Sequence, residues 1–224
     1  MLAIHLCKVN RTEFNILVLL TDHNVERVDE LFTFFAEQKV KYLQFIPCIE
    51  KENNQIASYS ITPEQYVRFL CRFFDLWVAH GPEKISIRFF DSLMSYLIHG
   101  RHTICTFNKR CNDYVVVEHN GDVFACDFFV EPQWYLGNML QTPIGEFATC
   151  PTKRCFGELK TEVGNQCFVC RYFDICRGGC LKDRIVANHE YGDKDYFCKS
   201  YQMFFDYALV KLMQKLPSII NRTE

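Results

Sequence analysis

The sequence predicts an α/β fold in which a cysteine-rich half follows a half built from strands and helices. Strand and helix patterns alternate over the first hundred residues, and ten of the thirteen cysteines follow residue 104. Strand–helix alternation implies a parallel sheet. Hydrophobic residues make up 49% of the 224 residues, which is enough for a core.

The first half begins with residues 3–7, which resemble the last turns of a helix. Residues 14–20 form a nearly continuous apolar run, as expected of a buried parallel strand. Asn24 is a candidate cap for the next helix, and residues 43–47 form a second predicted strand that should end at Pro47, which lacks a backbone donor.

The next helix has the clearest start signal in the chain. Thr62-Pro-Glu-Gln65 combines a capping residue, proline at the first helical position and a glutamine that completes a capping box. Gly81 should end this helix, and residues 85–89 form a third predicted strand. Asp91 is a candidate cap for a short helix that runs to Gly100. Because two or three parallel strands are too few for a complete layer, we expect the chain to be the back part of a longer α/β unit.

Composition excludes several classes of protein. The formal net charge is -2, without the basic excess of a nucleic-acid-binding surface. No apolar stretch reaches the length of a membrane helix, and the N-terminus does not have the pattern of a signal peptide. We therefore expect a cytoplasmic protein with neither a membrane nor a nucleic-acid partner. In that reducing compartment disulfides do not persist, so thirteen cysteines indicate metal or redox chemistry.

The cysteines differ in their surroundings. Cys7, Cys48 and Cys71 are far apart among apolar neighbours, and we interpret them as small buried hydrophobic residues. A predicted hairpin, turning at Asn120-Gly121, places Cys111 near Cys126. If it turns at these two residues alone, His119 faces Asp122 and Val115 faces Cys126.

A second group of cysteines has short spacings, Cys167-x2-Cys170-x5-Cys176-x3-Cys180, and Cys198 follows. Such spacings let thiolates converge on one metal centre. Gly178-Gly179 would let the backbone approach a cluster closely. Structural zinc, disulfides and iron–sulfur clusters all remain open at this point, with disulfides disfavoured by the compartment. Basic residues near these cysteines, among them Lys153, Lys160 and Arg184, are expected to be mostly solvated, while some of them could offset the charge of a cluster and so tune its potential.

The full set of cysteines resembles the SPASM domain, which ends many radical S-adenosylmethionine (SAM) enzymes and carries auxiliary [4Fe–4S] clusters. Residues 126–138 and 175–183 are more specifically similar to the anaerobic sulfatase-maturating enzymes. The resemblance implies that residues 1–100 are the last strands and helices of a partial (β/α)6 radical SAM barrel. Residues 101–216 would then be the SPASM domain, with a β-hairpin and a C-terminal helix, and residues 217–224 a tail.

The resemblance also implies the cluster ligands. One [4Fe–4S] cluster would be held by Cys105, Cys111, Cys126 and Cys180, and the other by Cys167, Cys170, Cys176 and Cys198. Cys150 and Cys155 are left as non-ligands. Enzymes of this family oxidise a cysteine or serine of a sulfatase to formylglycine, and the base that removes the substrate proton corresponds to Asp127. Without the resemblance, Asp127 would be interpreted as a solvated residue near a strand end.

One departure from the family is large. No Cys-x3-Cys-x2-Cys motif, which holds the SAM-cleaving cluster, occurs in the chain. We therefore expect no radical formation by this chain alone. SAM and a third [4Fe–4S] cluster would bind only in a full-length form, or with the missing N-terminal half supplied in trans. The alternative functions are a zinc-stabilised peptide-binding module and a SPASM-type maturase of another peptide.

Overall fold

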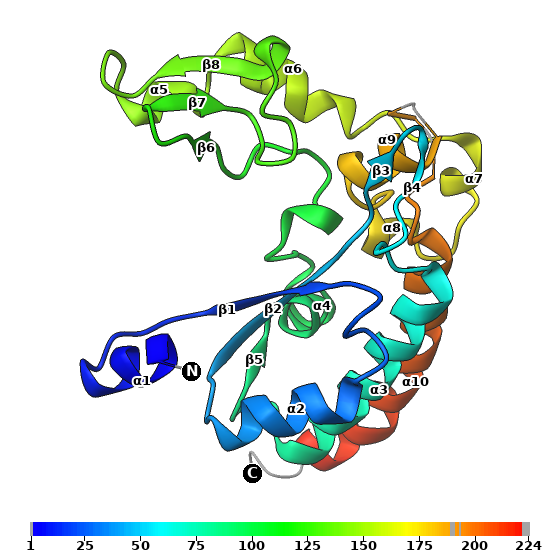
Figure 1. Ribbon diagram of the computed structural model, residues 1–224. Coiled ribbons are helices and arrows are strands. Elements are labelled where there is room, and N and C mark those ends of the chain that lie inside the picture. The colour runs from blue at the N-terminus through cyan, green and yellow to red at the C-terminus, as the bar shows by residue number, and fades with distance from the viewer. Residues whose placement is uncertain (1, 189–190, 193, 221–224) are drawn as a thin grey trace. The chain divides into compact units, whose positions relative to one another are not determined.

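A computed structural model describes residues 2–188, 191–192 and 194–220. The chain forms two compact units, the first made of Met1–Thr103 with Ser200–Glu224 and the second of Ile104–Lys199 (Figure 1). The second unit begins near the expected boundary at residue 100, but residues 200–216, which we expected in the SPASM domain, cluster with the first unit.

The first unit contains a three-stranded sheet in the order β1-β2-β5, and both pairings are parallel. The predicted parallel sheet is therefore confirmed. The elements of this unit, before the C-terminal helix, are α1 (Leu2–Val9), β1 (Ile16–Leu20), α2 (Val28–Glu37), β2 (Tyr42–Pro47), β3 (Lys51–Glu52), β4 (Gln55–Ile56), α3 (Pro63–His80), β5 (Ser86–Ile87) and α4 (Arg88–His99).

The apolar run of strand β1 predicted that both of its faces are buried, but one face is exposed. Leu17 and Leu19 are 58% and 52% exposed, whereas Leu20 is fully buried. Successive side chains of a strand point to opposite faces of the sheet. The face that carries Leu17 and Leu19 is therefore open in the part of the chain that the structure describes, and β1 is an edge strand there.

Helix α3 begins as its sequence predicts. The Gln65 amide donates to Thr62 Oγ1 at 3.2 Å, and the Thr62 amide donates to Gln65 Oε1 at 2.9 Å. This reciprocal pair is the predicted capping box, and Gly81 caps the other end of the helix. The caps expected elsewhere were wrong. Asn24 instead accepts from the Thr21 amide in the turn after β1, and Asp91 lies inside the first turn of α4, where it accepts from Ser86.

Helix α10 (Cys198–Ile220) lies beside α3 in the first unit (Figure 1). The Ser200 hydroxyl donates to the Pro63 carbonyl at 2.7 Å, and Tyr207 donates to Asp75 on the same helix. Stacked and edge-to-face aromatic contacts fill the core between α3, α4 and α10. Helix α10 continues past Pro217, where we expected it to end, and half of the expected tail, residues 221–224, lies outside the described residues.

The second unit consists of a small antiparallel sheet, in the order β6-β7-β8, and short helices. Its elements are η1 (Cys105–Phe107), β6 (Val116–Val117), β7 (Asp122–Phe124), η2 (Pro132–Trp134), β8 (Tyr135–Asn138), α5 (Ile144–Phe147), α6 (Pro151–Leu159), α7 (Asn165–Phe168), α8 (Phe173–Cys176) and α9 (Leu181–Asn188), followed by the first residues of α10. In the described part of the chain, no helix has the length and apolar character of a membrane span.

The predicted hairpin is present as β6–β7, but its register was wrong by one residue. Val116 pairs with Phe124 and Val117 with Val123, so Glu118 faces Asp122. The turn therefore contains three residues instead of two. Only Gly121 adopts a positive φ, of 87°, which is typical of a type I turn followed by a glycine bulge.

Replacing Thr62 with alanine should lower the free energy of unfolding by about 1 kcal/mol, because the Gln65 amide loses its capping acceptor. Urea unfolding followed by circular dichroism would measure the change. Thr33→Ala is the matched control, since Thr33 is an exposed residue inside α2 and alanine has the higher helix propensity. Equal destabilisation by the two substitutions would contradict the role of the cap.

Candidate metal centres

All thirteen cysteines are free thiols. Of the three that were expected to be small buried residues, Cys48 is buried, whereas Cys7 and Cys71 are only partly so. The two expected non-ligands, Cys150 and Cys155, have different surroundings. The Cys150 thiol accepts from the Lys153 amide at 3.5 Å as the cap of α6, and Cys155 is exposed. The other eight cysteines lie in the second unit and form two groups.

The first group surrounds the hydroxyl of Tyr114. This oxygen lies 3.6 Å from the sulfur of Cys105 and 3.8 Å from the sulfur of Cys126. Cys105 begins the short helix η1, and Cys126 lies two residues after the end of β7. Tyr114 therefore joins two cysteines that are 21 residues apart in the sequence.

Cys111 and Cys180 complete this first group. Burial raises the pKa of the Cys111 thiol, and the nearby Cys105 thiolate raises it further. Burial also holds the pKa of Cys180 well above its ordinary value, again with Cys105 among its charged neighbours. Cys111 packs against a small hydrophobic core that contains Cys126 and Leu181, the residue after Cys180. The first thiol group is thus Cys105, Cys111, Cys126 and Cys180.

The second thiol group consists of Cys167, Cys170, Cys176 and Cys198. Burial raises the pKa of Cys198 to about 11, and Cys167 and Cys170 contribute to the rise. Burial likewise raises the pKa of Cys176, whose thiol neighbours are Cys198 and Cys167. The two groups therefore have different members, and each contains four thiols.

The chain separates the two groups between Cys176 and Cys180, which are only four residues apart. All three residues between Cys176 and Cys180 adopt left-handed backbone conformations: Arg177 has φ 51°, Gly178 has φ 80° and Gly179 has φ 73°. A run of positive φ angles turns the chain sharply, which only glycine tolerates at low cost. This turn lies between Cys176, whose thiol neighbours are Cys198 and Cys167, and Cys180, whose thiol neighbour is Cys105.

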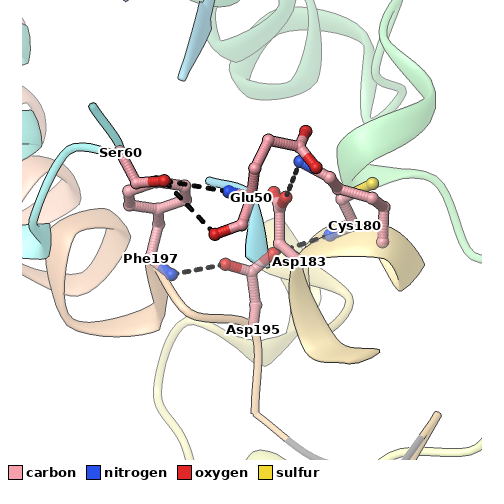
Figure 2. Close-up of polar contacts among 7 residues, drawn as sticks. Glu50, Ser60, Cys180, Asp183, Asp195 and Phe197 are labelled. Carbon is pink, nitrogen blue, oxygen red and sulfur yellow. Dashed lines mark hydrogen bonds and ion pairs between the residues drawn. The ribbon is translucent and has the colours of Figure 1, made fainter. Parts of the chain in front are cut away.

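Two buried side chains occupy the space beside this turn. A Cβ on Gly178 would collide with Nη2 of Arg184, and a Cβ on Gly179 would collide with the carboxylate of Asp195. Asp195 accepts hydrogen bonds of 2.7 Å from the amides of Cys180 and Phe197 (Figure 2). The two glycines are therefore required by close side-chain approach, in addition to their positive φ. Sequence reasoning missed Asp195, for which its place three residues before Cys198 is the only signal.

Four basic side chains near the cysteines, Lys153, Lys160, Lys182 and Arg184, are buried, although we expected most of the basic residues there to be solvated. Lys153, Lys160 and Arg184 are each no more than 1% exposed. The Lys153 ammonium donates to the carbonyls of Cys111 and Ala125, both at 2.7 Å, and Lys160 donates to the carbonyls of Cys105 and Thr106.

Buried cations are costly unless negative charge lies nearby. Burial lowers the pKa of Lys153, and the thiolates of Cys111 and Cys126 oppose that shift. The buried charges thus suit a site in which several thiolates are ionised together.

Asp127 lies at the edge of the first thiol group and is exposed. Its Oδ1 atom accepts from the Tyr114 hydroxyl at 3.3 Å and lies 3.3 Å from the sulfur of Cys126. Nothing in the sequence had indicated the contact with Tyr114. The arrangement leaves the carboxylate accessible while Tyr114 fixes one of its oxygens.

Across the described residues, no three histidine, cysteine or acidic side chains converge closely enough to hold a single metal ion. A [4Fe–4S] cluster binds each of its four thiolates through a different iron, so its ligands surround a volume instead of meeting at one atom. Each thiol group is compatible with such a cluster by its number of thiols, its burial and its nearby positive charge. The roles of the eight cysteines as ligands stay predictions.

Comparison with known proteins gives consistent results. Residues 105–171 match the SPASM family, an iron–sulfur cluster-binding domain. The chain is 34% identical, over 94% of its length, to the cysteine-type anaerobic sulfatase-maturating enzyme of Clostridium perfringens. It is 32% identical, over 93% of its length, to the serine-type enzyme of Bacteroides thetaiotaomicron. The chain spans 58% and 55% of the lengths of these two relatives.

Solved structures show the same relationship. Native anSMEcpe with bound AdoMet matches with a TM-score of 0.84 and 33% identity, which covers 95% of this chain and 59% of that chain. The structure of the same protein with AdoMet and the Cp18Cys peptide gives a TM-score of 0.85 and covers 60% of that chain. The chain therefore carries a SPASM iron–sulfur cluster-binding domain and is a homologue of the anaerobic sulfatase-maturating enzymes of the radical SAM superfamily.

Proposed function

We propose that each thiol group holds one [4Fe–4S] cluster. The first cluster would bind Cys105, Cys111, Cys126 and Cys180, and the second would bind Cys167, Cys170, Cys176 and Cys198. The observations that carry this proposal are the contacts of the Tyr114 hydroxyl with the sulfurs of Cys105 and Cys126, and the left-handed turn of Arg177, Gly178 and Gly179 between Cys176 and Cys180. The free thiols and the buried cations around them support it further.

We also propose that the first unit is the last part of a partial (β/α)6 radical SAM barrel. Its parallel strands alternate with helices, and the exposed Leu17 and Leu19 lie on an edge strand that further strands could extend and cover. The rest of the barrel, with SAM and a third [4Fe–4S] cluster, would come from a longer form of the protein or from a separate chain in trans. This chain has no Cys-x3-Cys-x2-Cys motif of its own.

In that assembly the substrate would be a sulfatase polypeptide whose cysteine or serine is oxidised to formylglycine. Asp127 would take the proton of the substrate thiol or hydroxyl, since its carboxylate is exposed and can be reached from solvent. Tyr114 would orient Asp127, because its hydroxyl donates to Oδ1. When bound, the clusters supply a route by which the electron released in this oxidation leaves the site.

The proposal predicts about eight irons per chain after anaerobic reconstitution with iron and sulfide, the sum for two cubanes. Cys111→Ala and Cys176→Ala should each lose about four of them, because each removes a ligand of one cluster. Iron and sulfide quantification measures both effects.

Cys155→Ala is the matched control, since Cys155 is exposed and outside both groups, and it should keep the full iron content. Binding of about one or two zinc ions without iron would contradict the proposal and favour a zinc-stabilised peptide-binding module.

Asp127→Asn should slow formylglycine formation by roughly 10²- to 10⁴-fold, the usual contribution of a general base. The assay joins this chain to the N-terminal segment of a homologue and follows a sulfatase peptide by mass spectrometry. Glu146→Gln, which changes an exposed carboxylate of the same unit outside both thiol groups, should leave the rate unchanged. An unaffected rate in the Asp127 variant would remove Asp127 from the mechanism. No product from a sulfatase peptide in the unmodified fusion would point instead to another peptide substrate.

A further inference from the structure

Arg184 is the most completely buried charged side chain of the second unit, and it lies in α9 with no exposed surface. Every hydrogen bond that its guanidinium makes within the described residues goes to a backbone carbonyl. Nε donates to Gly178 at 2.8 Å, and Nη1 donates to Glu162 at 2.8 Å and to Tyr191 at 3.0 Å. Both terminal nitrogens also donate to Lys160 at 3.3 Å, and Nη2 donates to Arg177 at 3.2 Å.

These acceptors lie on three segments, and each segment leads to proposed cluster ligands. Residues 160–162 precede Cys167, and Lys160 itself holds the carbonyls of Cys105 and Thr106. Residues 177–178 form the turn that separates Cys176 from Cys180. Tyr191 lies on the segment before Cys198. A single guanidinium thus fixes backbone next to members of both thiol groups.

The charge of Arg184 interacts with thiols of both groups. Burial lowers the pKa of its guanidinium, and the Asp195 carboxylate opposes that shift most, followed by the thiolates of Cys167 in the second group and of Cys180 and Cys111 in the first. Lys153 differs, since the thiolates that influence it are Cys111, Cys126 and Cys105, all of the first group. Arg184 is therefore placed to act electrostatically on two clusters, and Lys153 on one.

Asp195 supports the same arrangement from the other side of the turn. Its carboxylate holds the amide of Cys180, in the first group, and the amide of Phe197, directly before Cys198 of the second group (Figure 2). Gly178 and Gly179 leave the room that Arg184 and Asp195 occupy. The turn between the groups is thus enclosed by one buried cation and one buried carboxylate.

We infer that Arg184 is a positioning residue that fixes the two thiol groups relative to each other and places one positive charge near both clusters. This inference rests on the proposed function, because it requires both clusters. A reduced cluster is more negative than an oxidised one, so a nearby cation stabilises the reduced form and raises the reduction potential. The charge of Arg184 should therefore raise both potentials. The N–H groups of its guanidinium should hold in place the three segments that lead to the proposed cluster ligands.

The test compares Arg184→Met and Arg184→Lys in the complete reconstituted chain. The methionine variant removes the charge and should lower both cluster potentials in an anaerobic redox titration followed by electron paramagnetic resonance. The lysine variant keeps the charge but cannot reach carbonyls on all three segments. Its potentials should stay near those of the unmodified chain. Its iron should be lost to a chelator about 10-fold faster or more, as is typical when a residue that orients metal ligands is replaced.

Lys153→Met is the matched control, since it removes another buried cation but should lower only one of the two potentials. The inference is overturned if Arg184→Met shifts one potential or none, or if Arg184→Lys retains iron as well as the unmodified chain. If the methionine variant does not fold, the rate at which the lysine variant loses iron to a chelator still tests the positioning role of Arg184. If the unmodified chain binds no iron, the proposed function itself is overturned. If it binds about eight irons, and the Arg184 variants have unchanged potentials and retain their iron equally well, only this inference is overturned.

Discussion

The turn from Arg177 to Gly179 determines which thiols of this protein can act together. Cys176 and Cys180 are four residues apart, yet three successive left-handed residues send them to different thiol groups. A helical continuation of α8 would have placed both thiols on one face, because residues four apart are neighbours on a helix. Gly178 and Gly179 make the turn possible, and the Asp195 carboxylate holds its far end through the Cys180 amide. The proposed binding of two clusters instead of one depends on this local geometry.

Charge balance is the second condition that the cysteine-rich unit meets. Eight ionised thiolates in a partly buried region need compensating charge, and small units have little interior to provide it. Lys153, Lys160 and Arg184 bring three cations into that interior, and each is held by backbone carbonyls in the described contacts. Carbonyls fix these side chains, and the Asp195 carboxylate and the thiolates of both groups supply the negative charge that acts on Arg184. The same contacts tie segments that are far apart in the sequence, so folding and ligand placement are achieved together.

Local signals in the sequence were reliable where a short pattern determines the structure. The capping box at Thr62, the end of α3 at Gly81 and the parallel strand order follow from nearby residues and were predicted. The hairpin was found, but its register was not, since Asn-Gly is compatible with turns of two or three residues. The grouping of the cysteines came from a family resemblance, because spacing alone cannot show that Cys176 and Cys180 diverge. The burial of Arg184 and the roles of Tyr114 and Asp195 depend on contacts between distant segments, which no local pattern encodes.

We propose that eight thiols form two separate groups of four, each around its own iron–sulfur cluster. An anomalous difference map at the iron edge, from anaerobically grown crystals of the reconstituted chain, would locate the iron directly. We expect two iron centres, one enclosed by Cys105, Cys111, Cys126 and Cys180 and the other by Cys167, Cys170, Cys176 and Cys198. A single centre, or a centre that draws ligands from both groups, would contradict the proposal.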